Sequence, residues 1–129
     1  MDNSKERRYI DRLAVPQAKV YYRTLGRYAI FNYYQGPLDL ADISKSALRI
    51  YGKLPGEKNT NVEIKLVIPG FSMVTVKCRI MGFDERHTYT IAQLLPYGIG
   101  RNYNSFQTKH NLELLMTHSG GDAVQLNMV

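Results

Sequence analysis

The sequence predicts a mainly β protein, a small antiparallel six-stranded β-barrel followed by a C-terminal α-helix. Its first hundred residues contain short runs rich in Val, Ile, Tyr and Phe, mostly with apolar and polar residues alternating. Turn signals separate these runs at short intervals, which leaves no room for the helical crossovers that parallel strands require. A single pattern of helical period follows residue 103.

The predicted strands follow one another along the chain with short connections. The turn-like segment 24–27 separates the first two runs, and a polar loop over 52–60 separates the fourth from the fifth. Pro69–Gly70 predicts a tight turn, and the charged segment 84–86 predicts another. The six or seven runs cover residues 18–23, 28–34, 38–43, 47–51, 61–68, 72–83 and 87–95.

The helix is predicted from Asn104 onward, where Asn104 and Gln107 form a possible capping pair. Ser119–Gly120–Gly121 is expected to end it. A loose, mostly apolar stripe of helical period consists of Phe106, His110, Leu112, Leu115 and Met116.

The chain divides into three parts. Residues 1–12 form a flexible basic arm, residues 13–118 the barrel with its helix, and residues 119–129 a disordered tail. The first 27 residues hold seven Lys and Arg side chains and three acidic ones, so much of the net charge of +6 lies at this end. Such a charge favours an anionic partner.

The expected location is the cytoplasm. The sequence begins with a polar segment rather than a hydrophobic signal region, and no apolar run approaches the length of a membrane span. Cys78 is the single cysteine, so an internal disulfide is excluded and a reducing compartment is favoured. Cys78 itself is expected to be a small core residue.

Neither a metal site nor catalysis is expected. Cys78 and the three histidines lack the short paired spacings of a tetrahedral zinc site. His87 is predicted to be a turn residue and His110 a helix-face residue. Asp84 and Glu85 are adjacent carboxylates in a charged turn, which explains them without an enzyme, and no cofactor is implied.

Two arginines of the N-terminal arm, Arg8 and Arg12, are spaced as RxxxR. A guanidinium is a planar fork of donors that meets phosphate oxygens in pairs and also matches the O6 and N7 acceptors of guanine. On a flexible arm, such a pair can close over a ligand that carries both groups. Arg7 precedes the pair and can add to the grip.

Asp42 and Ser44 lie in the segment between two predicted strands. An ionised carboxylate only accepts hydrogen bonds, so Asp42 suits the N–H edge of guanine, and the Ser44 hydroxyl can donate to phosphate. The two side chains share a face if the strand continues through them. Taken alone, the same two residues are better explained by the chemistry of a turn.

The arm and this segment together resemble the PilZ domain family. The resemblance rests on Arg8-x-x-x-Arg12 and on Asp42-Ile43-Ser44-Lys45-Ser46-Ala47, and it extends over roughly residues 7–117. It implies a PilZ-like barrel that acts without catalysis as a bacterial receptor for cyclic di-GMP in motility, biofilm formation or polysaccharide secretion. Arg8, Arg12, Asp42 and Ser44 would contact the ligand, and a protein partner would carry the signal.

Ala47 stands where the family has a glycine. If this position requires a positive φ, alanine costs about 1 kcal/mol; if the ligand approaches the backbone here, the methyl group contacts it.

Two alternatives stay open. Some members of the family do not bind the nucleotide and act as protein adapters. A basic barrel with ten tyrosines could also bind single-stranded nucleic acid through outward rings, although no RNA-binding motif is present and this partner is not expected.

Overall fold

The computed structural model describes residues 13–15, 17–26 and 33–118. Within them the chain forms six strands and one helix, in the order β1 (Lys19–Thr24), β2 (Gln35–Ile43), β3 (Ala47–Tyr51), β4 (Asn61–Val67), β5 (Val74–Asp84), β6 (Tyr89–Leu94) and α2 (Phe106–His118). The predicted arm 1–12, with Arg7, Arg8 and Arg12, and the predicted tail 119–129 lie outside the described residues.

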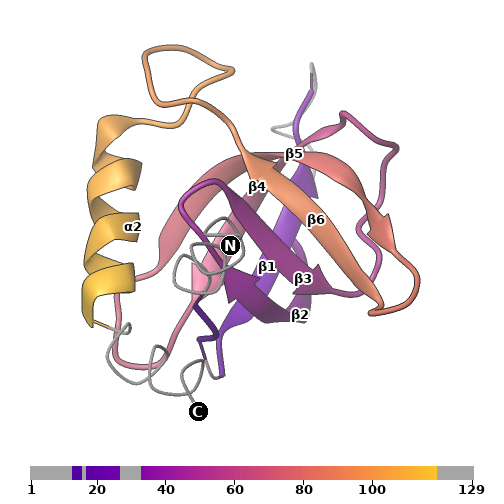
Figure 1. Cartoon of the computed structure of the whole chain (residues 1–129). Helices are drawn as coiled ribbons and strands as arrows, with labels where there is room; N and C mark the ends of the chain where they lie inside the picture. Colours follow the sequence, from indigo (N-terminus) through magenta and orange to yellow (C-terminus); the bar gives the residue numbers. More distant parts are fainter. Residues whose placement is uncertain (1–12, 16, 27–32, 119–129) are drawn as a thin grey trace, which may run out of the picture.

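The strands close into an antiparallel barrel with the order β1-β2-β3-β6-β5-β4. Figure 1 shows this barrel with α2 standing beside it. The predicted fold class, a six-stranded antiparallel barrel with a C-terminal helix, is therefore confirmed.

Alternation along the strands builds the core. In β4, Val62, Ile64 and Leu66 are fully buried, and the residues between them face outward. Cys78 is buried in the same core, as predicted, and this burial raises the pKa of its thiol.

A bulge in β2 sets which residues of this strand face outward. The pairing with β3 shifts between Leu40 and Asp42. Because of the extra residue, Leu40 and Ile43 are both buried although they are three positions apart. Asp42 consequently lies on the outer face, opposite Arg49 of β3.

The segment 28–34 does not meet the strand prediction where it is described. Tyr33 and Tyr34 precede β2 without strand pairing, and Tyr33 is almost fully exposed. Residues 28–32 lie outside the described residues. The first residues of the strand are instead the polar Gln35 and Gly36, which pair with β1 at Gln35.

The start of α2 differs from the prediction by one residue. The hydroxyl of Ser105 accepts a hydrogen bond from the Thr108 amide at 3.1 Å, so Ser105 is the cap. Asn104 is buried, and its side chain bonds the backbone of Lys77 and Leu95. It joins the loop before α2 to β5 and to the residue that follows β6.

The predicted apolar stripe of α2 is correct only in part. Leu112 and Leu115 are buried, and Met116 packs against the core. Phe106 and His110 are exposed. At 100° per residue, His110 is 200° from Leu112, so the two side chains leave opposite sides of the helix.

Within the described part of the chain, no helix combines the length and the apolar character needed to cross a membrane.

Candidate functional site

The base of the N-terminal arm pairs with the segment that holds Asp42 and Ser44. The Leu13 amide donates to the Ile43 carbonyl at 2.8 Å, and the Ile43 amide donates to the Leu13 carbonyl at 2.9 Å. Leu13 directly follows Arg12, and Ile43 lies between Asp42 and Ser44. The residue at which the arm joins the barrel therefore lies beside the segment that holds Asp42 and Ser44.

Ser44 belongs to the turn of the β2–β3 hairpin. Its hydroxyl accepts from the amides of Ser46 and Ala47 at 3.3 and 3.2 Å. The backbone pair Ser44 N to Ala47 O, at 2.9 Å, closes the hairpin around Lys45 and Ser46. Because β2 ends at Ile43, Ser44 does not share a strand face with Asp42, and its side chain performs the turn chemistry typical of serine.

Ala47 is the first residue of β3 and pairs with Gln93 of β6. Among the described residues, positive φ values occur at other positions and not at Ala47. The backbone at this point therefore does not require glycine, and the alanine causes no strain. Any effect of its methyl group has to come from contact with a ligand.

The carboxylate of Asp42 is paired with Arg49. The Arg49 Nε donates to Asp42 Oδ1 at 2.8 Å, and Nη2 donates to Oδ2. Both side chains are largely buried, with 17% of Asp42 and 21% of Arg49 exposed. The hydrogen bond to Asp42 raises the pKa of Arg49 although burial opposes it, so the guanidinium is firmly charged.

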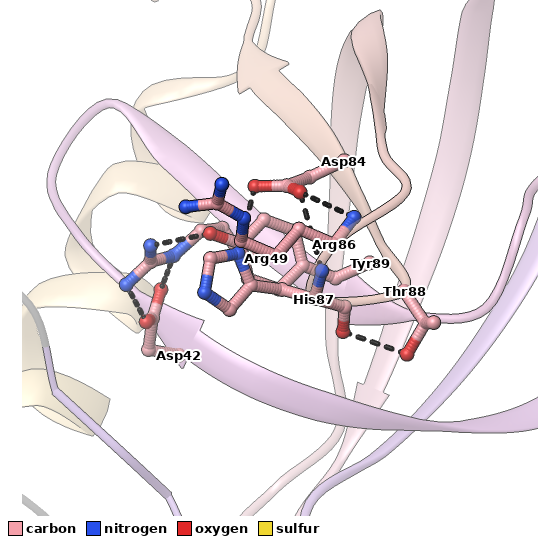
Figure 2. A network of polar contacts seen from close by, with 7 residues as sticks. All are labelled: Asp42, Arg49, Asp84, Arg86, His87, Thr88 and Tyr89. Carbon is pink, nitrogen blue, oxygen red and sulfur yellow. Dashed lines mark hydrogen bonds and ion pairs between the residues drawn. The ribbon is translucent and has the colours of Figure 1, made fainter.

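The network continues from Arg49 to β6. Nη1 of Arg49 donates to the Tyr89 hydroxyl at 3.0 Å, and the guanidinium carbon lies 5.0 Å from the centre of the Tyr89 ring. Tyr89 in turn stacks on His87 of the β5–β6 turn (Figure 2). A continuous polar and aromatic surface thus runs over the outside of β2, β3 and β6, which we call the hairpin face: Asp42, Arg49, His87, Tyr89 and the turn residue Ser44.

The turn itself is held by Asp84. Its carboxylate accepts from the amides of Arg86 and His87 at 3.0 and 3.2 Å, and its second oxygen lies 3.0 Å from His87 Nδ1. These bonds, that of the His87 side chain first, lower the pKa of Asp84. The prediction of His87 as a turn residue is confirmed.

Sequence reasoning found Asp42 and missed Arg49. The signal was available, because a two-residue turn at Lys45–Ser46 places Asp42 directly opposite Arg49, as observed. His87 was interpreted only as a turn residue, and the three-residue spacing from Asp84 is what fixes its ring.

The described residues contain no group of three or more His, Cys, Asp or Glu side chains able to hold a metal ion. No protein-family model matches the sequence, and neither does any curated protein.

Proposed function

We propose that the chain is a receptor for cyclic di-GMP that binds its ligand between the N-terminal arm and the hairpin face. In this proposal the protein does not catalyse a reaction. It acts in the cytoplasm, and binding changes its interaction with a protein partner in motility, biofilm or polysaccharide control. The barrel fold agrees with the family that the two sequence motifs resemble.

The observation that carries the proposal is the pairing of Leu13 with Ile43. An extended chain spans at most about 3.5 Å per residue. Arg12 is the residue next to Leu13, and Arg8, five residues before Leu13, can lie up to about 18 Å from it. Both arginines can therefore lie over the hairpin face. Leu13, which directly follows the first motif, pairs with Ile43 of the second motif thirty residues further on, and this pairing supports a shared site.

The hairpin face offers donors as well as acceptors to such a ligand. Three of the five N–H groups of Arg49 are used by Asp42 and Tyr89, which leaves two for phosphate or for guanine. Asp42 retains free lone pairs that suit the N–H edge of guanine. In this proposal Ser44 stabilises the hairpin turn, and Arg49 donates to phosphate in place of Ser44.

The test is a calorimetric titration of the full chain with cyclic di-GMP. We expect saturable binding that falls at least a hundredfold in the Arg8→Ala/Arg12→Ala variant, because two charged bidentate contacts are lost. Arg7→Ala is expected to change the affinity only a few fold. Binding that survives the double change would refute the role of the arm.

A matched control keeps the loss of charge separate from the loss of contact. Lys58→Ala/Arg101→Ala also removes two cations, both from exposed loop positions, and should bind the ligand as the unaltered protein does. An equal loss of affinity in this control would show that net charge, not the arm, is responsible.

The second candidate function is that of a protein adapter that does not bind the nucleotide. Asp42 and Ser44 already have partners within the chain, which favours it. In addition, a groove of about 360 Å³ lies between the hairpin turn and α2, and Leu94, Leu112 and Met116 give it an apolar lining. No binding at high micromolar cyclic di-GMP, in a folded protein, would select this candidate.

A further inference from the structure

An aromatic pair lies where the β5–β6 turn leads into β6. The rings of His87 and Tyr89 stack with centroids 5.4 Å apart and planes only 10° from parallel. The side chain of His87 remains 56% exposed. Because Tyr89 stacks with an offset on one side of the imidazole, we infer that the exposed surface includes the opposite side.

The imidazole is held in place before any ligand arrives. An ionised carboxylate only accepts hydrogen bonds, so Asp84 fixes the proton of His87 on Nδ1 and leaves Nε2 at the other edge of the ring. Thr88, the next residue, has a φ of 58° and donates its amide to the Asp84 carbonyl at 2.8 Å. The turn around His87 is therefore closed by both backbone and side-chain bonds.

The pair is continuous with the rest of the hairpin face. Figure 2 shows the His87 ring beside Tyr89 and the guanidinium of Arg49 at the hydroxyl of Tyr89, which accepts from Arg49 at 3.0 Å. A planar group that lies on His87 would thus extend the stack of His87 on Tyr89, with the cation of Arg49 close by. Exposed, pre-ordered rings beside cations are the usual platform for a nucleic acid base.

We propose that the exposed face of His87 is a stacking site for a purine base, which in the proposed receptor is one guanine of cyclic di-GMP. The inference rests on the proposed function for the identity of the ligand, but the stack itself does not depend on the arm.

The experiment compares three variants of the full chain by calorimetry with cyclic di-GMP. His87→Ala removes the platform and should weaken binding roughly five- to hundredfold, the range found when a stacking ring is replaced by alanine. His87→Phe keeps a ring but loses the bond to Asp84, and should bind within about threefold of the unaltered protein. Glu85→Ala, an exposed neighbour in the same turn, should bind normally. Equal affinity of His87→Ala and the unaltered protein would overturn the inference.

A second measurement separates this inference from the proposed function. Guanosine monophosphate, titrated to millimolar concentration, should shift the ring protons of His87 upfield in NMR spectra, even in the Arg8→Ala/Arg12→Ala variant. If cyclic di-GMP binds through the arm while these protons do not move, the platform is refuted and the receptor stands. If the protons move but cyclic di-GMP does not bind, the receptor is refuted and the platform stands.

Discussion

Two faces of the barrel carry the same three kinds of side chain in different arrangements. On the hairpin face, Arg49 pairs with Asp42 and bonds the hydroxyl of Tyr89. On the outside of β1 and β4, Arg23 pairs with Glu63 at 3.0 Å, and Tyr34 is the neighbouring tyrosine. We call this second group the Arg23 cluster: Arg23, Tyr34, Glu63 and Lys65.

The tyrosine hydroxyl donates to the carboxylate in one group and accepts from the arginine in the other. Tyr34 donates its hydroxyl to Glu63, and its ring is approached by Arg23 at 4.7 Å and by Lys65 at 4.1 Å. The Arg23 cluster therefore closes on itself. The buried Nε of Arg23 has no hydrogen-bond partner among the described residues. On the hairpin face, the tyrosine hydroxyl accepts from the arginine, and the ring stacks on the exposed His87.

The difference indicates which face is suited to a ligand. The ring of Tyr34 is already approached by two cations, so it is poorly placed to stack a base, and Arg23 is paired with Glu63 on the outside of the barrel. Arg23 and Arg27 also have the RxxxR spacing, but Arg23 has its partner in Glu63. The pair Arg8 and Arg12 leads instead into Leu13 and the hairpin face.

The largest expected difference between the two faces comes from replacing the arginine of each, Arg49 on the hairpin face and Arg23 in the Arg23 cluster. Arg49→Ala and Arg23→Ala each leave a largely buried carboxylate without its cation, and each should lower the free energy of unfolding by about 1–3 kcal/mol. Only Arg49→Ala should also weaken cyclic di-GMP binding, by tenfold or more. Denaturant titration and calorimetry on both variants check this. Equal affinities in the two variants would erase the distinction between the faces.

Tyr34→Phe tests whether the Arg23 cluster is closed. The lost bond to Glu63 should cost about 1–2 kcal/mol of unfolding free energy at neutral pH. Burial and the bond to Glu63 raise the pKa of Tyr34 from 10.0 to about 12. The folded protein therefore retains this proton above pH 10 when the unfolded chain does not, and its contribution to stability is lost as the pH rises from 10 to 12.

An ultraviolet titration of the folded protein should accordingly show an ionisation near pH 12 that is lost in Tyr34→Phe. Tyr89→Phe is the matched control and should retain this late step. A late step that persists without Tyr34 would contradict the assignment.

Ser44→Ala examines the hairpin face at its turn. Loss of the bonds to the Ser46 and Ala47 amides should cost about 1 kcal/mol. The affinity for cyclic di-GMP should change less than threefold, because the hydroxyl serves the turn. A thirtyfold loss of affinity in a variant of normal stability would restore Ser44 to the ligand site.

Ala47→Gly is expected to have the smallest effect. Since the backbone at this position does not require glycine, the change should lower stability by about 0.5–1 kcal/mol through added chain entropy. We expect an affinity within threefold of the unaltered protein. Binding that becomes more than tenfold tighter would show that the methyl group intrudes on the ligand.

The barrel was predictable because its information is local. Alternation such as Val62, Ile64 and Leu66 marks a strand, and Pro69–Gly70 marks the turn after it, where the Phe71 amide bonds the Ile68 carbonyl. The bulge at Leu40 and Asp42 was not predictable, because no residue in this segment signals an extra position.

The candidate site was only partly predictable for a different reason. The chemistry of Asp42 and Ser44 was enough to predict them as site residues. Their hydrogen-bond partners within the protein, however, depend on strand pairing. Arg49 donates to the Asp42 carboxylate across the hairpin, and the Ala47 amide donates to the Ser44 hydroxyl. Tyr89 and His87 come from another hairpin, so their contact with Arg49 arises only when the barrel closes.

The most direct test is an amide NMR titration of the isotopically labelled full chain with cyclic di-GMP, which reports on both faces at once. The account predicts that the amides of Leu13, Ile43, Arg49 and His87 shift, while those of Glu63 and Lys65 stay in place. Shifts confined to Glu63, Lys65 and their neighbours, with the hairpin face unchanged, would contradict it.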